Sequence, residues 1–283
     1  MIAFEPNWIQ QRFPEYSYLS TLNSGGQKDV CLIYSKTKGN CVLKIVNPNT
    51  DLKRIEREIQ TVCKHHFSNV PEIYEKGTVE YAGNKLFFII EQYISGSNLR
   101  KLISRSALPC LQVQSIVHQL LLIVVELERK NVVHRDIKPE NVILDCNGKV
   151  WLIDFGIVLD CSQTALTAPS ARYAPLCTLG YAAPEQIRNL KADISSKSDL
   201  FAIGVMAFEL LTQHHPLRDN AAGQLDILYR TENMQLPPVP PSFNVPSEFD
   251  QFIHWLAERW PSRRPESAVA ALKYFQQNFL GGK

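Results

Sequence analysis

The sequence lacks a strong excess of charge of either sign. Its 283 residues include 30 lysines and arginines against 28 aspartates and glutamates, for a formal net charge of +2. A nucleic-acid-binding protein usually presents a basic stripe, whereas here charges of both signs are interspersed. The composition therefore argues against a nucleic-acid partner, and it gives no reason to expect binding to a membrane surface.

Long apolar runs are also missing. The longest runs from Leu120 to Val125 and stops at Glu126, far short of the ~20 residues that a membrane-spanning helix needs. The start of the chain, residues 1–6, has neither a basic region nor a long apolar stretch, so we expect no signal peptide. We therefore expect no membrane segment in this chain and a cytoplasmic location.

Paired cysteine motifs are absent as well. The seven cysteines form no C-x-x-C pair, and an odd number of thiols is typical of a reducing compartment. Cys63, His65 and His66 do lie together, but two or three ligands without a second cluster make a poor zinc site. We interpret this cluster as the end of a helix and the loop after it.

The N-terminal third is typical of a small sheet with one helix. Strand-like segments cover 18–22, 30–34, 41–46 and 87–90, bounded by turn residues. Between them, residues 51–64 have helical spacing, with an apolar stripe along one side. These segments predict a β-rich lobe over 15–94, preceded by an N-terminal extension over 1–14.

After Gly96 the pattern changes to long helices. Apolar residues with helical periodicity cover 111–129, 198–212 and 248–258, and short strands interrupt them at 142–144 and 150–153. The proline-rich stretch 236–246 predicts a loop, with a polyproline II ligand for a partner domain as the alternative. The expected architecture is α+β, a single domain over 1–283 in which a larger, mostly α-helical lobe over 95–283 follows the β-rich lobe.

Two short motifs contain most of the groups that phosphoryl transfer requires. That reaction needs an anchor for the phosphates, metal ligands, a carboxylate to orient the attacking hydroxyl, and positive charge on the transferring group. Residues 134–141 read HRDIKPEN, and residues 154–156 read DFG after an apolar strand. Here the sequence resembles the protein kinase family, whose catalytic loop is HRDxxxxN and whose metal loop is DFG.

The resemblance extends over nearly the whole chain. Residues 183–185 match the APE motif that closes the family's activation segment, and Arg264 resembles the arginine that pairs with its glutamate. Residues 42–44 match the end of the family's VAIK strand, and Asp199 resembles the start of its large central helix. The motifs look similar to those of bacterial serine/threonine kinases. The resemblance implies a two-lobed protein kinase fold and an ATP-dependent serine/threonine kinase.

The resemblance also implies a role for each residue of the two motifs. Asp136 orients the attacking hydroxyl, because the loose transition state depends on positioning more than on basicity. Lys138 neutralises charge that builds on the γ-phosphoryl oxygens. Asn141 and Asp154 offer the hard oxygen ligands that Mg²⁺ requires, with Mn²⁺ as the alternative ion. His134 is expected to be a packed residue rather than a catalytic base.

Lys44 is the expected anchor for the α- and β-phosphates of ATP, and in the family its partner is a glutamate of the first helix. Glu56 and Glu58 are the two candidates. Glu58 falls on the apolar stripe of the helix over 51–64, whereas Glu56 falls on the polar side. A carboxylate on a buried stripe is costly unless it is paired. We therefore expect Lys44 to pair with Glu58.

The phosphate loop departs from the family pattern GxGxxGxV, which falls on residues 23–30. Only Gly25 of the three signature glycines is in place. Asn23 tolerates left-handed backbone angles, and Gly26 adds freedom. Lys28 adds a charged side chain where the family has none. Taken alone, this loop would not indicate a nucleotide site.

The adenine ring should lie between apolar side chains, as a flat ring requires. The resemblance places Leu22, Val30 and Val42 on one side of the ring and Ile143 on the other.

The hinge pattern of the family, aligned on Gly96 and Leu99, places Glu91 at the gatekeeper position. The backbone of the hinge residues then meets adenine, and these residues are Gln92, Tyr93 and Ile94. With one residue of slippage, Ile90 becomes the gatekeeper instead.

The acceptor and the regulation are also implied by the resemblance. Lys138 and Thr178 match the serine/threonine class, in which the threonine hydroxyl bridges Lys138 and Asp136. Arg135 precedes the catalytic aspartate, where the family binds a phosphorylated residue of the activation segment. We expect substrates to be proteins with Ser/Thr acceptors, and we expect autophosphorylation at one of three positions: Thr164, Thr167 or Ser170.

Two other functions remain as alternatives. The first is a pseudokinase, a binding or scaffold module that has kept the fold and lost the chemistry; only the incomplete glycine loop supports it. The second is a small-molecule kinase of the aminoglycoside or choline type, which shares the two aspartates but lacks a segment closed by APE. The sequence does not indicate an oligomeric state.

Overall fold

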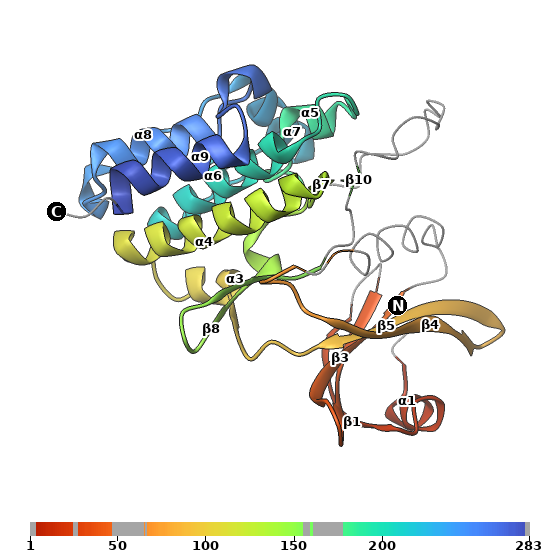
Figure 1. The fold of residues 1–283 in the computed structure, drawn as a ribbon. Helices are drawn as coiled ribbons and strands as arrows, with labels where there is room; N and C mark the ends of the chain where they lie inside the picture. The colour runs from red at the N-terminus through yellow and green to blue at the C-terminus, as the bar shows by residue number, and fades with distance from the viewer. Residues whose placement is uncertain are drawn as a thin grey trace. The chain divides into compact units, whose positions relative to one another are not determined.

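The computed structural model describes residues 4–24, 28–46, 65, 67–154, 159–160 and 178–280. The chain divides into two compact units. The first comprises Met1–His66 and Val70–Ser95, and the second comprises Phe67–Asn69 and Gly96–Lys283. Figure 1 shows strands β1 to β5 in the first unit and helices α3 to α9 in the second. The helix expected over 51–64 lies outside the described residues.

The first unit is built on one five-stranded antiparallel sheet, in the order β1-β2-β3-β5-β4. A short helix precedes the sheet in the chain. These elements are α1 (Pro6–Arg12), β1 (Tyr16–Ser24), β2 (Lys28–Ser35), β3 (Gly39–Val46), β4 (Ile73–Tyr81) and β5 (Asn84–Gln92).

One face of this sheet holds the core of the first unit. Leu43 and Ile45 of β3 are fully buried, and they lie opposite Ile90 and Phe88 of β5. Directly opposed residues of paired strands share a face, so these side chains pack together. Ile9 of α1 belongs to the same buried cluster and is 1% exposed. The helix therefore covers this face of the sheet.

Aromatic rings attach α1 to the end of the β4–β5 hairpin. The ring of Trp8 stacks on Phe4 at a centroid distance of 5.1 Å and meets the edge of Tyr81 at 4.8 Å. Pro6 occupies the first turn, where a backbone N–H would have no partner within the helix. The residues expected only as an N-terminal extension thus form part of the first unit.

The second unit is mainly α-helical, as the sequence predicts. Its helices are α3 (Leu99–Ile103), α4 (Cys110–Arg129), α5 (Pro184–Ile187), α6 (Ser196–Thr212), α7 (Gln224–Asn233), α8 (Ser247–Leu256) and α9 (Ala268–Phe275). Single helical turns follow other segments, namely η1 (Pro139–Asn141), η3 (Pro241–Phe243), η4 (Pro261–Arg263) and η5 (Gln276–Leu280). Its strands are β6 (Gly96–Asn98), β7 (Val132–Val133), β8 (Val142–Asp145), β9 (Val150–Leu152) and β10 (Leu159–Asp160). The α+β architecture expected from the sequence is confirmed.

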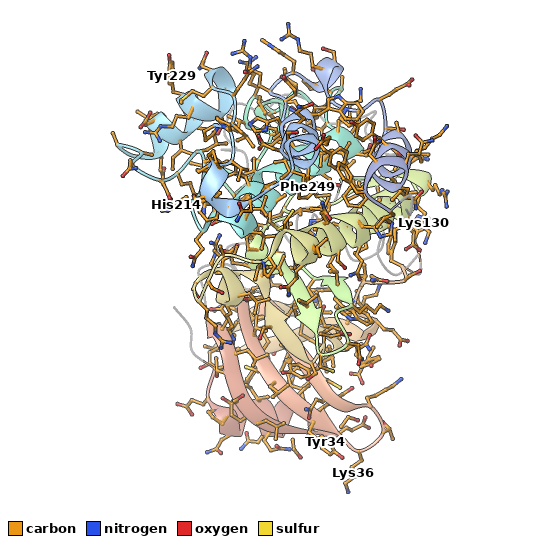
Figure 2. The ribbon with its side chains drawn as sticks, turned by 90° about the vertical axis from the view of Figure 1, so that its left-hand side faces the viewer. Tyr34, Lys36, Lys130, His214, Tyr229 and Phe249 are labelled. Atoms are coloured by element: carbon orange, nitrogen blue, oxygen red, sulfur yellow. The ribbon has the colours of Figure 1, made fainter. Side chains whose placement is uncertain are left out.

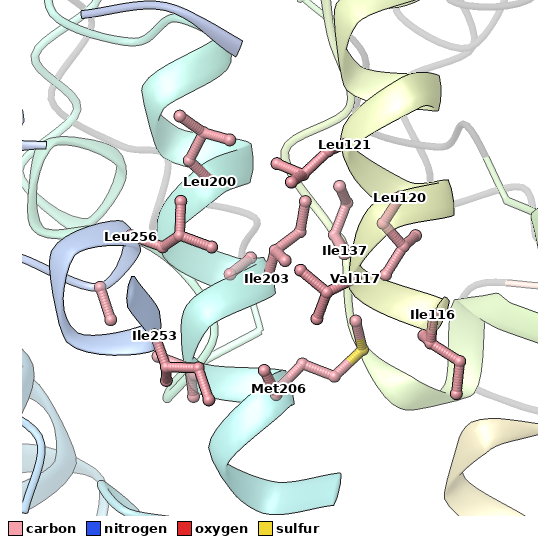
Figure 3. Close-up of a cluster of buried hydrophobic side chains, with 14 of the residues drawn as sticks. Ile116, Val117, Leu120, Leu121, Ile137, Leu200, Ile203, Met206, Ile253 and Leu256 are labelled. Carbon is pink, nitrogen blue, oxygen red and sulfur yellow. The ribbon is translucent and has the colours of Figure 1, made fainter. Parts of the chain in front are cut away.

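The core of the second unit lies between α4, α6 and α8. Figure 3 shows Leu120 and Leu121 of α4 facing Ile203 of α6, with Ile253 and Leu256 of α8 on the other side of α6. All five side chains are fully buried. By length and composition α4 could cross a membrane, and among the described helices it alone meets that test. Half of that apolar stretch is buried inside the unit, so α4 serves here as a core helix.

Aromatic side chains fill the core between α8 and α9. Phe249 is fully buried and lies inside the helical unit in Figure 2, whereas Tyr229 of α7 lies at its surface and is 64% exposed. Phe249 meets Phe275 edge-on at 6.3 Å, and Phe252 meets Phe275 at 5.5 Å. Edge-on aromatic pairs of this kind fix the packing of the two helices beyond what buried area alone supplies.

A small three-stranded sheet, in the order β6-β8-β9, joins the helices to the predicted site. Gly96 of β6 lies opposite Asp145 of β8. A Cβ atom at Gly96 would lie 2.5 Å from the carbonyl oxygen of Leu144 and 2.7 Å from a methyl carbon of Ile143. Glycine therefore permits this close approach of β6 to β8.

Residues Phe67–Asn69 pack in the second unit although both flanking segments belong to the first. Asn69 donates its side-chain N–H to the carbonyl of Val150 at 2.6 Å, and its own carbonyl accepts the N–H of Leu152 at 2.9 Å. The N–H of Ser68 donates to the carboxylate of Glu126 at 3.0 Å. These bonds fix the segment to β9 and α4.

Candidate active site

The predicted catalytic loop, residues 134–141, begins at the end of β7 and is held by a buried carboxylate of α6. Asp199 Oδ2 accepts the N–H of His134 at 2.9 Å, and Oδ1 accepts the N–H of Arg135 at 2.8 Å. Burial raises the pKa of Asp199 to about 7, and the two N–H donors oppose that shift. The start of α6 therefore fixes the backbone where the loop leaves the strand.

Two of the predicted site residues have left-handed backbone angles. The φ angle is +70° at Arg135 and +71° at Asp154, a region that L-residues with side chains seldom occupy. The carbonyl of Arg135 accepts a hydrogen bond from Gln186 Nε2 at 2.9 Å, in addition to the bond from its N–H to Asp199. Both polar backbone groups of Arg135 are thus held in place.

The carboxylate of Asp136 lies at the centre of a cluster of hydrogen bonds. Oδ2 lies 2.6 Å from Lys138 Nζ and 3.0 Å from Asn141 Nδ2. Oδ1 accepts the hydroxyl of Thr178 at 2.6 Å, and the same hydroxyl accepts from Lys138 Nζ at 2.8 Å. The bridge of Thr178 between Asp136 and Lys138 is the one that the resemblance implied. These bonds fix the carboxylate in one orientation.

Asn141 and Asp154 are brought together by the backbone. The N–H of Ile153, the residue before Asp154, donates to the carbonyl of Asn141 at 2.8 Å. Asn141 uses its side-chain N–H₂ for Asp136, both to Oδ2 and to the main-chain oxygen at 2.9 Å. Its amide oxygen is therefore the atom available for a cation.

This donor set fits a magnesium ion held together with phosphate groups. Mg²⁺ is usually bound in proteins by one or two side-chain oxygens, waters and substrate phosphates. In the described part of the chain, no group of three or more His, Cys, Asp or Glu side chains gathers as an all-protein metal cage would require. Cys63 and His66 of the poor zinc candidate lie outside the described residues.

His134 is a packed residue, as expected. It has no exposed surface, and burial lowers its pKa to about 4. The ring is therefore neutral near pH 7. Its Nδ1 atom lies 3.3 Å from the N–H of Asp136, which donates to it. A neutral imidazole in this position supports the backbone of the loop.

The APE segment is held by a buried ion pair. Glu185 Oε1 lies 2.6 Å from Arg264 Nη1, and Oε2 lies 3.0 Å from Nη2. Ser198 of α6 also donates to Glu185, at 2.6 Å. The Glu185 and Arg264 side chains are 2% and 0% exposed. The pair implied by the resemblance is thus present, and it is a bidentate one of the strong kind.

In the first unit, strand register gathers several predicted nucleotide residues on one face. Val30 lies opposite Lys44, and Val42 lies opposite Glu91. Opposed residues share a face, and residues two apart on a strand do too, so all four point to the side away from α1. Asn23 of β1 is paired with Val30.

Lys44 and Glu91 form an ion pair on that face. The distance from Lys44 Nζ to Glu91 Oε1 is 2.5 Å, and the two side chains are 9% and 12% exposed. A carboxylate at position 91 thus points toward the lysine expected to anchor the phosphates. In the alternative with Ile90 as gatekeeper, Glu91 would belong to the hinge and its side chain would face away, which does not fit this contact. The expected partner Glu58 lies outside the described residues.

The remaining predicted residues differ in their exposure and in the strand face that they occupy. Leu22 lies at a register shift of β1 and is 47% exposed. Gln92 ends β5 on the α1 side, opposite Cys41. Ile94 is buried, and Ile143 of β8 is partly buried opposite Trp151. The other predicted positions lie outside the described residues, and these are Gly25, Gly26, Thr164, Thr167 and Ser170.

Sequence reasoning missed a second charged cluster beside the loop. Arg100 of α3 contacts Glu140 at 2.8 Å and Glu209 of α6 at 2.6 Å. Arg100 also donates to the hydroxyl of Tyr181, which itself donates to Glu209. The signal was available, because Glu209 falls within an apolar helix and a carboxylate buried there needs a partner.

Comparison with known proteins gives concordant matches. A family model described as "Protein kinase domain" matches residues 16–279. The serine/threonine-protein kinase PknL of Mycobacterium tuberculosis is 30% identical over 221 residues, which is 77% of this chain and 53% of the relative. The serine/threonine-protein kinase PrkC of Bacillus subtilis is 28% identical over 261 residues, which is 89% of this chain and 39% of the relative. The chain thus spans about half, or less, of the length of these curated relatives.

Proposed function

Because the chain belongs to the protein kinase domain family, we propose that it transfers the γ-phosphoryl group of ATP to serine or threonine hydroxyls of proteins. The observation that carries this proposal is the carboxylate of Asp136, held by three side chains at once. A carboxylate fixed in this way suits a reaction whose transition state depends on positioning. The names of the relatives, all serine/threonine-protein kinases, support the acceptor class.

The hydrogen bonds of Asp136 leave room for the acceptor hydroxyl. An ionised carboxylate has about four lone-pair sites. Lys138 and Asn141 occupy those of Oδ2, and Thr178 occupies one of Oδ1. The remaining site on Oδ1 accepts the hydroxyl of the substrate. The hydroxyl oxygen forms the new bond to phosphorus, the bond to the bridging oxygen breaks, ADP leaves with that electron pair, and the hydroxyl proton passes to Oδ1.

Lys138 stabilises the charge of the transferring group. Its ammonium donates to both Asp136 and Thr178, so its position is fixed before a substrate binds. A donor that is already oriented costs no reorganisation during the reaction, which is the main source of electrostatic catalysis.

Asn141 and Asp154 hold the divalent cation in this proposal, and Lys44 holds the α- and β-phosphates. The cation, Mg²⁺ or Mn²⁺, neutralises phosphate charge when it is bound. Val30 and Val42 supply apolar contacts to the adenine ring from the face that also carries Lys44. Glu91 competes with ATP for Lys44, since the two form an ion pair. A cytoplasmic location and protein substrates complete the proposal.

Arg135 is proposed as the docking point for a phosphorylated residue of the segment 154–185. Its side chain is partly exposed, and its backbone is fixed on both sides. A phosphate there would form charge-assisted bonds with the guanidinium and order the segment. Thr164, Thr167 and Ser170 are the proposed acceptors. Mass spectrometry of active protein should find at least one of them phosphorylated, and full activity with all three unmodified contradicts the proposal.

The decisive experiment is incubation with labelled ATP and Mg²⁺, alone and with generic protein acceptors. Asp136→Ala and Lys44→Met should each reduce transfer by on the order of a hundredfold or more, with an unchanged circular dichroism spectrum. Asp193→Ala, at an exposed acidic residue of the same unit, is the matched control and should retain full activity. Binding of ATP without transfer by the unmodified chain indicates a pseudokinase. Near-normal transfer by Asp136→Ala rules out the mechanism.

A further inference from the structure

The segment 236–241 follows α7 and ends at the first residue of η3, and the prolines of its sequence, LPPVPP, restrict its backbone. Each proline fixes its own φ near −65°. Four of the six residues also precede a proline, which disfavours the α region for them. Pro240 has φ −58° and ψ 140°, the angles of polyproline II. We call this segment the proline strip.

A polyproline II helix has three residues per turn, so the proline strip has three edges. Leu236 and Val239 form one edge and are 8% and 9% exposed. The other two edges consist of prolines alone, and all of these prolines are exposed, namely Pro237 with Pro240 and Pro238 with Pro241. The segment therefore buries one edge in the core of the second unit and presents the opposite side, which has no charged and no hydrogen-bonding side chain.

Helix α8 holds the buried edge in place. His254 Nε2 lies 3.1 Å from the carbonyl oxygens of both Leu236 and Pro237, and it donates its proton to them. Asp250 Oδ1 accepts the N–H of Val239 at 3.2 Å. The backbone groups that turn toward the helix are thus satisfied. The strip is held in its extended form before any partner binds, which reduces the entropy lost on binding.

A shallow hollow adjoins one exposed edge. It has a volume of about 390 Å³, and Pro238 lines it together with Trp255, Glu258 and Arg263. Arg263 is exposed, so the hollow offers a charged contact beside the apolar strip.

We propose that the proline strip is a docking site for a protein domain that reads P-x-x-P through an aromatic-lined groove. In such complexes two edges of the polyproline helix lie on the aromatic groove. Here the two exposed edges are the ones that consist of proline, and the third edge is already used by α8. Stiffening of a loop would explain prolines in general. It does not explain why both outward edges, and neither inward position, are proline.

The test is a calorimetric titration of the whole chain with three isolated readers of polyproline II: an SH3 domain, a WW domain and an EVH1 domain. At least one should bind saturably at one site. The double variants Pro237→Ala/Pro240→Ala and Pro238→Ala/Pro241→Ala each remove one exposed edge and keep the buried one. Each should weaken binding by about tenfold or more. A tryptophan-to-alanine change in the groove of the probe domain should have the same effect.

Pro246→Ala is the matched control, since Pro246 is an exposed proline of the same loop beyond η3. It should bind the probe as the unmodified chain does. Unchanged thermal midpoints and unchanged phosphoryl transfer show that the double variants are folded. Failure of all three probes to bind overturns the proposal. So does binding that survives both double variants, or an effect of these variants on self-association alone, which would make a second copy of the chain the occupant.

Discussion

Arg135 and Asp154 show what the surroundings of a single residue must supply. A left-handed φ at a residue with a side chain costs of order 1–3 kcal/mol and persists only where neighbouring groups hold it. At Arg135, Asp199 accepts a hydrogen bond from the backbone N–H, and Gln186 donates one to the backbone carbonyl. The strain lies directly beside Asp136. It places the carboxylate proposed to orient the substrate hydroxyl at a sharp change of chain direction, where contacts from three other positions fix its side chain.

The Lys44–Glu91 pair leads to a prediction for ligand selectivity. Glu91→Met and Glu91→Thr should tighten the binding of ATP-competitive inhibitors whose apolar ring extends past residue 91. The gain should be about 1–3 kcal/mol, because such a ring no longer covers a carboxylate that cannot be hydrated. Inhibitor and ATP affinities are measured by calorimetry. Lys85→Met, at an exposed position near the start of β5, is the control and should change neither. Unchanged affinities in both Glu91 variants refute the role of Glu91.

Two buried histidines and one buried aspartate make the stability of the second unit depend on pH in opposite senses. Burial lowers the pKa of His134 from 6.5 to about 4 and that of His215 to about 3. Below pH 6.5 the unfolded chain binds a proton on each histidine, whereas the folded chain does not. The contribution of the two histidines to stability is therefore present above pH 6.5 and is lost as pH falls. Burial raises the pKa of Asp199 from 3.8 to about 7, so its contribution is largest below 3.8 and is lost as pH rises toward 7.

His215→Asn isolates one of these contributions. His215 Nδ1 accepts the N–H groups of Leu217 and Arg218, and the amide oxygen of asparagine can replace that acceptor. Below pH 6.5 the free energy of unfolding of the unmodified protein should fall relative to that of the variant. The difference should change by about 1.4 kcal/mol per pH unit down to the folded pKa. Urea denaturation at several pH values measures it, and parallel pH profiles for the two proteins would contradict it.

At this scale, the resemblance predicted contacts of the site well where both partners belong to motifs of the family. The bridge of Thr178 and the pair of Glu185 with Arg264 were both implied by the resemblance and are present. The contact of Lys44 with Glu91 depends instead on the register of β3 against β5, which no single strand encodes. The Arg100 cluster belongs to none of these motifs, and its sequence signal is Glu209, a carboxylate within an apolar helix that needs a partner.

Among the described elements of the first unit, α1 and β4 were not predicted; in the second unit, the short strands β6, β7 and β10 and the helices α3, α5, α7 and α9 were not predicted. α1 has only seven residues, too few for an apolar stripe to repeat. β4 is an edge strand with charged residues and a glycine, which is how natural sheets protect an edge, and this pattern does not alternate cleanly. The long helices and the inner strands were predicted because packing on a core imposes a regular spacing on them.

The position of Ile9 predicts that α1 stabilises the first unit. Ile9→Ala removes a side chain that is 1% exposed and should cost about 2–5 kcal/mol. The loss should be confined to the first unit, because Ile9 packs in the core of that unit. Hydrogen exchange of β3 and β5 amides should accelerate while that of α4 and α6 amides does not. Gln11→Ala, at an exposed position of the same helix, should leave both rates unchanged.

On the scale of the whole molecule, residues 67–69 tie the second unit together across a long stretch of chain. Asn69→Ala removes the hydrogen bond to the carbonyl of Val150, a fully buried residue, and should destabilise the unit by about 1–3 kcal/mol. Urea denaturation measures the change in stability, and hydrogen exchange of the Leu152 amide measures it separately near residue 69. Ser68→Ala is the control, because Ser68 is exposed and bonds through its backbone alone. Equal stability of Asn69→Ala and the unmodified chain contradicts the prediction.

The same three residues set an order for folding during synthesis. All of the first unit has left the ribosome once Ser95 has emerged, so its sheet can close at that point. Asn69 must wait longer, because its partner Val150 lies 81 residues further along the chain. At about 5–20 residues per second the delay is roughly 4–16 s. During that time the side-chain amide and the carbonyl of Asn69 lack their partners in β9, and the synthesis of β9 supplies them.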